Sequence, residues 1–281
     1  MLQGIDVSHH QGAIDWTKVK ADFAIIRAGY GKYAYQEDPC FEDNIKGAYN
    51  AGIPVGVYWY SYADTAAEAR QEAEVCLTVI KPYEDMITLP VFFDQEYEPA
   101  ILAAWNSIRT ECCVAFIKAI EAAGYKAGLY GSQDWLDNKI DDSQIPATAT
   151  VWVAQYSNEC TYKGRYTIWQ YTSDGSVDGI KGRVDLNQAL DDLLTSTADG
   201  WQKITGKWYW YEDGKPVTNC WRKVTGASGV AYWYYLGPNG AMLKGMQRIK
   251  GKIYYLNPAA AMGVPEGACI ITDSNGEVKR S

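Results

Sequence analysis

The feature that most constrains this chain is an apolar run at residues 89–93 that leads into the acids Asp94 and Glu96. The run is too short for a helix and predicts a buried parallel strand. Side chains two positions apart point to the same side of a strand, so the two carboxyls are expected to lie together. Burial and mutual repulsion raise the pKa values of such a pair, and one carboxyl then keeps its proton while the other is ionised. The alternative is a strand end whose acids merely face solvent.

Length and composition favour a folded, acidic protein. The 281 residues are 47% hydrophobic, which is enough for a substantial core. The net charge of −8 argues against nucleic acid as a partner, because nucleic-acid binders usually carry a basic face. No apolar run has the length of a membrane helix, so we expect no membrane partner. The start of the chain runs directly into Gly4-Ile5-Asp6 and leaves no room for a signal peptide.

The cysteines and histidines give no sign of a metal or redox centre. Seven cysteines, an odd number, include no CxxC motif, and we expect reduced, mostly buried thiols. The two histidines, His9 and His10, are adjacent and would point in opposite directions on an extended backbone. We therefore expect neither a metal ion nor another cofactor.

Strand and helix patterns alternate through the first 194 residues. Helices are predicted at residues 39–50, behind a capping-box sequence that starts at Thr65, and at residues 108–123. The predicted strands lie at residues 2–7, 23–28, 53–59, 89–93, 126–130, 150–154, 167–170 and 183–186. This order predicts an α/β barrel whose helical layer thins in its second half. Acids at or near strand ends would converge on one mouth of the barrel, and they are Asp6, Asp94, Glu96 and Asp185.

The sequence changes character after Leu194. Residues 195–200 read as a short polar linker, and residues 201–281 follow as a second domain. Residues 200–256 hold five Trp, seven Tyr and no Phe, arranged in repeats of alternating aromatic residues. Turn sequences follow these aromatics at Asp213-Gly214, Asn239-Gly240 and, in a weaker copy, Asn275-Gly276. Each repeat predicts a β-hairpin, and because one hairpin cannot bury its own apolar face, the copies are expected to stack into a small solenoid.

Separated motifs in the first part resemble the glycoside hydrolase family 25 lysozymes, often called Chalaropsis-type muramidases. The motifs are Gly4-Ile5-Asp6-Val7-Ser8, residues 91–96, and Ile168-Trp169-Gln170-Tyr171 followed by Val184-Asp185. The resemblance covers about residues 1–194 and implies an irregular, flattened (β/α) barrel of the TIM type. It also implies a muramidase that hydrolyses bacterial peptidoglycan at the β-1,4 bond between N-acetylmuramic acid and N-acetylglucosamine, with net retention. The alternatives are a non-catalytic wall binder, which the presence of all four acids disfavours, and a chitinase-like carbohydrase.

The same motifs imply roles for individual side chains. Glu96 matches the general acid, and Asp94 would stabilise the oxocarbenium-like transition state or orient the acetamido group of the substrate. Asp6 and Asp185 would complete the acidic cluster. Aromatic side chains would stack on sugar rings, or else pack in the barrel core, and they are Tyr58, Tyr60, Tyr130, Trp152 and Trp169.

The tail resembles the choline-binding, or cell-wall-binding, repeats of bacterial autolysins and phage endolysins. Trp201 and Trp208, with an aromatic residue from the next copy, would then form a box that holds a quaternary ammonium by cation–π attraction. Met246 stands where a Trp is expected, so few boxes are complete, and another wall polymer is the alternative ligand. The residues expected to contact the wall are Trp201, Trp208, Trp221 and Trp233. The start of the chain favours cytoplasmic synthesis and release to the wall, as in a phage endolysin, over secretion with a separate signal.

Overall fold

The computed structural model describes residues 1–190, 193, 200–204, 207–212, 215–226, 229–261, 263–272 and 278–279. The backbone forms two compact units, Met1–Leu194 and Thr195–Ser281. Most of the predicted linker, residues 195–199, lies outside the described residues, as do the predicted turns at Asp213-Gly214 and Asn275-Gly276. Each unit is described by itself below.

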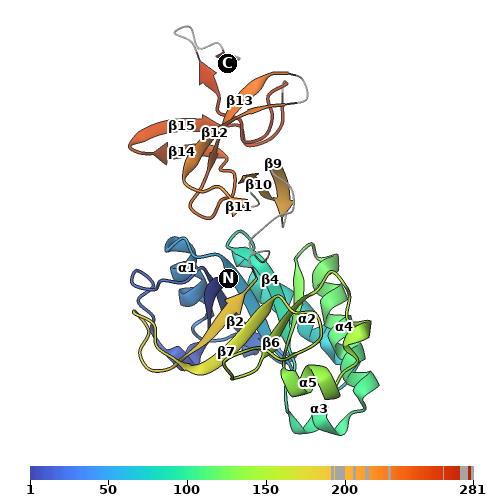
Figure 1. Ribbon diagram of the computed structural model, residues 1–281. Helices are drawn as coiled ribbons and strands as arrows, with labels where there is room; N and C mark the ends of the chain where they lie inside the picture. The colour runs from blue at the N-terminus through green and yellow to red at the C-terminus, as the bar shows by residue number, and fades with distance from the viewer. Residues whose placement is uncertain are drawn as a thin grey trace. The chain divides into compact units, whose positions relative to one another are not determined.

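The first unit is a closed barrel of eight strands in the order of the sequence (Figure 1). The strands are β1 (Leu2–Val7), β2 (Phe23–Tyr30), β3 (Val55–Tyr60), β4 (Ile87–Asp94), β5 (Ala127–Ser132), β6 (Thr150–Ala154), β7 (Ile168–Gly175) and β8 (Val184–Ala189). Strands β1 to β7 pair in parallel, whereas β8 runs antiparallel to both β7 and β1. The predicted α/β barrel is therefore confirmed, and the reversed last strand is the feature that sequence periodicity did not reveal.

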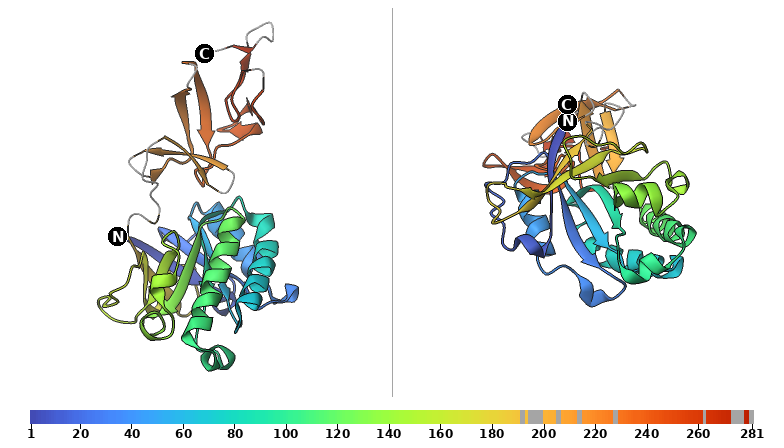
Figure 2. Two further views of the ribbon diagram at one scale, coloured as in Figure 1. Left: turned by 90° about the vertical axis from the view of Figure 1, so that its right-hand side faces the viewer. Right: turned by 60° about the horizontal axis from the view of Figure 1, so that its bottom comes forward.

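The helices cover the outside of the barrel unevenly. They are α1 (Phe41–Asn50), α2 (Ala66–Ile80), α3 (Pro99–Ala103), α4 (Asn106–Ala122) and α5 (Gln133–Asn138). Helices α2 and α4 pack side by side (Figure 2), and the Thr65 hydroxyl accepts a hydrogen bond from the amide of Glu68 at the start of α2. Residues 155–167 and 176–183, which precede β7 and β8, contain no helix. The helical layer thins in the second half, as predicted.

Successive side chains along each strand point to opposite faces of the barrel wall and so belong to two different hydrophobic clusters. In β6, Val151 and Val153 join the cluster between the strands and the helices, whereas Trp152 and Ala154 join the cluster inside the barrel. Parallel strands covered on both faces need apolar residues at nearly every position, which explains the continuous apolar run that ends at Phe93. The inward positions at the strand ends are the ones that carry polar side chains.

The second unit consists of antiparallel strand pairs. Its strands are β9 (Gly200–Ile204), β10 (Lys207–Glu212), β11 (Lys215–Pro216), β12 (Cys220–Thr225), β13 (Ala231–Leu236), β14 (Gly245–Ile249), β15 (Lys252–Leu256), β16 (Ile271–Thr272) and β17 (Val278–Lys279). Pairs β9/β10, β12/β13 and β14/β15 correspond to the predicted repeats. The turn between β14 and β15 places Lys250 and Gly251 at φ 47° and 80°, the left-handed geometry that tight hairpins require.

The cysteines and the helices were also considered in the sequence for disulfides and membrane spans. All seven cysteines are free, and Cys76, Cys112 and Cys113 are buried. Within the described ranges, no helix is both long enough and apolar enough to cross a membrane.

Candidate active site

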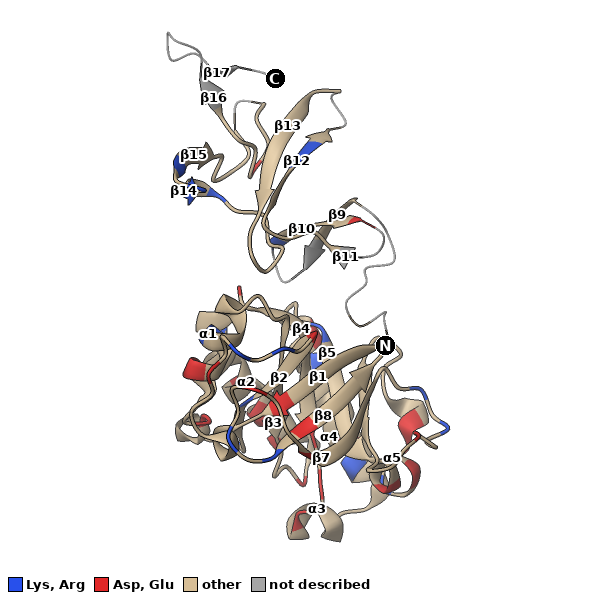
Figure 3. Cartoon of the chain, turned by 60° about the vertical axis from the view of Figure 1, so that its left-hand side comes forward, with Lys and Arg blue, Asp and Glu red and all other residues tan. Residues whose placement is uncertain are grey.

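Three of the four predicted acids occupy inward positions at one end of the barrel. Asp6 on β1 and Asp185 on β8 are register partners, and acidic positions on these neighbouring strands are visible in Figure 3. Because β8 is antiparallel, its first residues lie at the end where the parallel strands finish. Asp94 is the last residue of β4, and it is 4% exposed. The fold thus brings together carboxyls that are up to 179 positions apart in sequence, from Asp6 to Asp185.

Glu96 reaches the same place by a different route from the one that strand alternation predicts. Strand β4 ends at Asp94, so Glu96 lies in the following loop and not on a strand. Its carboxyl nevertheless forms a side-chain hydrogen bond with Asp94. The prediction that the two carboxyls lie together is right, but the loop and not the pleat of the strand places Glu96 there.

The environment raises the pKa of both members of this pair. Burial raises the pKa of Asp94 well above its ordinary value, and the charge of Glu96 adds to the effect. Burial also raises the pKa of Glu96, while its hydrogen bond with Asp94 acts in the opposite direction. Both carboxyls of the pair are thus shifted toward the protonated form, with burial as the main cause for each.

Asp6 is held by a buried hydrogen-bond network. Its Oδ2 accepts from Gln170 Nε2 at 3.0 Å and from Asn187 Nδ2 at 2.7 Å. Trp152 Nε1, which can only donate, is bonded to Asn187 Oδ1 at 2.8 Å and so fixes which end of that amide faces Asp6. Burial, followed by the charge of Asp185, raises the pKa of Asp6 to about 8. Burial also raises the pKa of Asp185.

One cation is built into the same end of the barrel. Arg27 follows the inward-facing Ile25 by two positions on β2, and its Nε donates to Asp38 Oδ2 at 2.7 Å. His9 Nδ1 contacts both Arg27 and Asp38, and Asp38 is 1% exposed. The positive charge of Arg27 opposes the rise in the pKa of Asp94. Among the described residues no group of three or more His, Cys, Asp or Glu is arranged to hold a metal ion.

A cavity of about 310 Å³ opens beside Glu96. It is lined by Gln95, Glu96, Tyr97, Tyr130, Ser132, Ala154 and Tyr156, which come from the ends of β4, β5 and β6 and from the loops that follow them. A half-buried carboxyl with a raised pKa beside a concave, tyrosine-lined surface has the chemistry of a general acid acting on a polyhydroxylated ligand.

Comparison with known proteins identifies the barrel. The sequence profile described as Glycosyl hydrolases family 25 matches residues 5–180. The chain belongs to glycosyl hydrolase family 25. Lysozyme M1 of Streptomyces globisporus is 31% identical over 201 residues, which are 66% of this chain and 67% of that protein. The chain is accordingly a glycoside hydrolase of the lysozyme type.

Solved structures of an autolysin and of an endolysin resemble the barrel. The modular autolysin LytC from Streptococcus pneumoniae, in complex with a synthetic peptidoglycan ligand, is 30% identical with a TM-score of 0.58 over 66% of this chain and 46% of that one. The catalytic domain of endolysin ply40 from bacteriophage P40 of Listeria monocytogenes is 25% identical with a TM-score of 0.60 over 69% of this chain and 95% of that one. The family 25 hydrolase described here therefore spans less than half the length of LytC.

The predicted sugar-stacking residues of this hydrolase separate into two groups. Tyr58, Tyr60 and Tyr130 lie near the acids, whose charges act on all three phenols. Trp152 is 2% exposed, and its ring is surrounded by Phe92, Tyr58 and Tyr130, so it packs inside the barrel and supports Asn187. Trp169 joins the outer cluster, so its predicted stacking role is wrong, as is that of Trp152.

Several residues of the site were given no role from the sequence, although Gln170 lies in one of the quoted motifs. They are Arg27, Tyr97, Tyr156, Gln170 and Asn187. Gln170 and Asn187 had a usable signal, because each lies an even number of positions from another inward residue on its strand. Tyr97 and Tyr156 lie on loops, where no periodicity applies.

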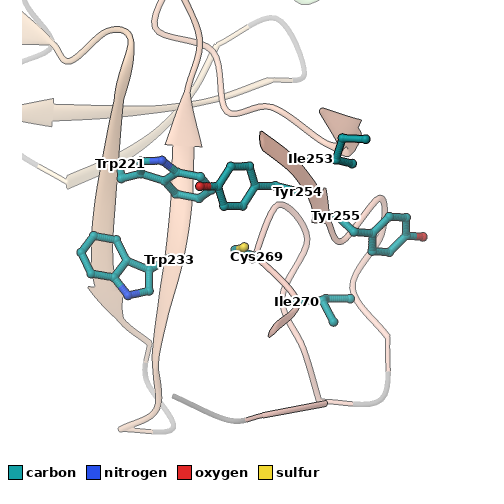
Figure 4. A pocket seen from close by; sticks show the side chains of 7 residues that line it. All are labelled: Trp221, Trp233, Ile253, Tyr254, Tyr255, Cys269 and Ile270. Atoms are coloured by element: carbon teal, nitrogen blue, oxygen red, sulfur yellow. The ribbon is translucent and has the colours of Figure 1, made fainter. Parts of the chain in front are cut away.

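The tail contains two aromatic cavities. Trp201 and Trp208 line a cavity of about 380 Å³ together with Tyr234 of the next strand pair, and Glu266 lies at its wall. Trp221 and Trp233 line a second cavity of about 580 Å³ with Tyr254 and Tyr255 (Figure 4). The predicted grouping of two Trp residues with an aromatic from the following copy thus has a structural counterpart, and its ligand stays a prediction.

Proposed function

We propose that the barrel is an N-acetylmuramidase, which hydrolyses bacterial peptidoglycan at the β-1,4 bond between N-acetylmuramic acid and N-acetylglucosamine. The observation that carries this proposal is the hydrogen-bonded carboxyl pair of Asp94 and Glu96, in an acidic mouth that also contains Asp6 and Asp185. The peptidoglycan ligand bound to LytC supports the substrate class.

Glu96 is the general acid in this proposal. It lines the cavity and is the outer member of the pair, so it can reach a glycosidic oxygen, whereas Asp94 is buried beneath it. The raised pKa of Glu96 lets it carry a proton to the leaving oxygen. Burial also raises the pKa of Asp94, so a protonated Asp94 can donate its O–H to the carboxylate of Glu96 once that proton has left.

The distance between the Asp94 and Glu96 carboxyls indicates which group can act as the nucleophile. Carboxyls of a retaining pair with a carboxylate nucleophile stand about 5–5.5 Å apart across the scissile bond. Asp94 and Glu96 are in hydrogen-bond contact and therefore approach the sugar from the same side. Net retention then requires a second group, and the acetamido oxygen of the substrate fits this role. Because the pKa of Asp6 is raised to about 8, the ionised member of the Asp6 and Asp185 pair would face the positive charge that develops on the ring.

The Gln170 and Asn187 amides orient Asp6 for this task. Both donate to one oxygen of its carboxyl, which leaves the other oxygen available to the substrate. Tyr130 and Tyr156 in turn donate to Gln170 Oε1 at 2.9 and 3.2 Å and link the network to the cavity wall. Tyr58, Tyr60 and Tyr130 remain the candidates for contact with sugar rings.

The tail would target the hydrolase to the bacterial wall. The cavity formed by Trp201, Trp208 and Tyr234 suits a quaternary ammonium such as choline, because the aromatic rings attract a cation, and the Glu266 carboxylate at its wall is already paired with Lys244 at 2.7 Å. The Trp221 and Trp233 cavity suits a different wall component, since the ammonium of Lys223 already lies 6.0 Å from the centroid of the Trp233 ring.

Digestion of purified peptidoglycan tests the proposal. The products are reduced with borohydride and identified by mass spectrometry, and a muramidase yields new muramitol ends. New glucosaminitol ends would show cleavage of the other glycosidic bond, and the absence of new reducing ends would show a binder. Glu96→Gln serves as the control for contaminating hydrolases.

A further inference from the structure

The loop that carries Glu96 has little backbone support of its own. Strand β4 ends at Asp94, and residues 95–98 have no regular secondary structure. The position of the Glu96 carboxyl therefore depends on how its neighbours in sequence are anchored. Those neighbours, Gln95 and Tyr97, both make their contacts outside the barrel.

Gln95 points away from the acids into the layer behind the strands. It is 0% exposed, and its Oε1 accepts from Cys113 Sγ at 3.3 Å and from Trp135 Nε1 at 3.4 Å. The indole N–H can only donate, which fixes the side-chain amide with its oxygen toward Trp135. Its Nε2 has no hydrogen-bond partner in the described part of the chain. A buried glutamine with one unsatisfied end costs stability, so packing alone does not explain a glutamine at this position.

Trp135 also contacts the residue on the other side of Glu96. The Tyr97 ring meets the indole edge-on, with 4.9 Å between the centroids, and the Tyr97 hydroxyl donates to Asp134 Oδ2 at 2.9 Å. One fully buried indole on α5 thus touches both neighbours of Glu96.

The indole is itself firmly held. Its backbone amide donates to the Ser132 hydroxyl at the start of α5, and the Arg109 guanidinium lies 5.6 Å from the ring centroid. Arg109 Nε and Nη1 donate to backbone carbonyls of Ile101, Leu102, Ala104 and Lys139. Helices α3, α4 and α5 are thereby tied together around the indole.

We propose that Gln95 and Trp135 are positioning residues, which hold Glu96 against Asp94 in the geometry needed for proton transfer. This inference rests on the proposed role of Glu96 as the general acid. Gln95 lines the cavity, but the amide oxygen that anchors it accepts from Trp135, and Trp135 is not among the cavity-lining residues. The effect of both side chains on Glu96 therefore passes through the loop. A misplacement of about 1 Å can cost on the order of 10²-fold in rate, which makes such anchors kinetically visible.

Four variants test the proposal in the full chain. Gln95→Met keeps the shape and removes the amide, Trp135→Phe removes the N–H donor, and the third variant combines the two. The matched control is Trp16→Phe, because Trp16 is 6% exposed and also donates a buried indole hydrogen bond, to Asn44 Oδ1 on α1. Each variant is assayed on a soluble peptidoglycan fragment for kcat, KM and the pH profile, with thermal melting recorded in parallel.

We expect Gln95→Met and Trp135→Phe each to lower kcat by about 10- to 100-fold with KM within about twofold of the parent. The double variant should lose little more than either single variant, because both remove the same contact. Water reaching a looser Glu96 should lower its pKa and move the alkaline limb of the kcat profile to lower pH. Trp16→Phe should melt at a reduced temperature but keep kcat and the pH profile.

Other outcomes overturn the inference. Unchanged kcat in Gln95→Met, or a kcat loss in Trp16→Phe equal to that in Trp135→Phe, would reduce Gln95 and Trp135 to packing residues. Gln95→Met decides the matter even if Trp135→Phe fails to fold, because the cost of leaving the Trp135 N–H without its acceptor is offset by removal of the unsatisfied Gln95 Nε2. Glu96→Gln separates the two proposals. An active Glu96→Gln variant would show that Glu96 is not the general acid. An inactive Glu96→Gln variant together with a Gln95→Met variant of normal activity would reject only the positioning role of Gln95 and Trp135.

Discussion

Tryptophan is used differently in the two units of this hydrolase. In the barrel, Trp59, Trp135 and Trp152 are at most 2% exposed, and each indole N–H donates to a defined oxygen. In the tail, Trp208 lines an open cavity, and Trp233 is 37% exposed. Apart from Trp105, which is 82% exposed, the barrel uses its indoles to hold other groups in place, whereas the tail presents them as a surface.

The difference follows from how each unit buries apolar area. A closed barrel with helices around it covers both faces of its strands, so an indole there must satisfy its N–H internally. A hairpin pair has only its neighbours to pack against, and its aromatic faces stay partly open. Substitutions should therefore affect catalysis from the barrel and binding from the tail, with little exchange between them.

The largest effect should come from Glu96→Gln. Glutamine keeps the shape of the side chain but has no proton to give, so hydrolysis of peptidoglycan should fall by about 10²–10⁴-fold. Binding of the protein to intact walls should not change. Loss of turbidity measures hydrolysis, and a pull-down with intact walls measures binding on the same sample. Retention of more than about a tenth of the activity would show that Glu96 is not the general acid.

The next effect in size should come from removal of the tail. A protein of residues 1–194 should fold, because both hydrophobic clusters of the barrel are built entirely from residues within this range. It should cleave soluble glycan fragments at the parental rate and lyse intact cells at least about 10-fold more slowly, since the tail no longer concentrates it at the wall. Insolubility, or undiminished lysis of cells, would contradict this division of labour.

The same contrast explains what could be predicted from sequence. The barrel strands followed from apolar runs that burial on both faces requires, and three of the acids followed from their positions at or near the strand ends. Glu96 escaped that logic because its loop is held by Gln95 and Trp135, which are far apart in sequence. How deeply each carboxyl of the pair is buried is not visible in a spacing of two residues.

In the tail, two substitutions should separate the two cavities. If the Trp201 and Trp208 cavity binds choline, Trp208→Ala should raise the Kd for choline by about 5-fold, as measured by the choline-induced change in Trp fluorescence. This factor corresponds to the loss of one cation–π contact of about 1 kcal/mol. Trp233→Ala, in the other cavity, is the matched control and should leave the response intact. Wall binding that resists millimolar choline but is lost in Trp208→Ala would indicate another polymer.

The smallest effect should be on the pH dependence of stability, and its sign should differ between the units. The pKa of Asp6 rises from 3.8 to about 8 on folding, so the folded barrel binds a proton that the unfolded chain has lost. Its stabilisation is fully present below about pH 4 and is lost as the pH rises to about 8. In the tail, the hydrogen bonds from Arg222 lower the pKa of the exposed Glu212, so that small contribution is lost when the pH falls.

Scanning calorimetry of the intact chain between pH 5 and pH 8.5 checks this sign. The barrel transition should move to lower temperature as the pH rises, by about 2–4 °C for each kcal/mol lost. In Asp6→Asn the fall should be shallower, because an amide at this position has no proton to release and still accepts from Gln170 and Asn187 through its oxygen. An equally steep fall in Asp6→Asn would assign the effect to other buried acids, of which Asp94 and Glu72 have pKa values raised by burial.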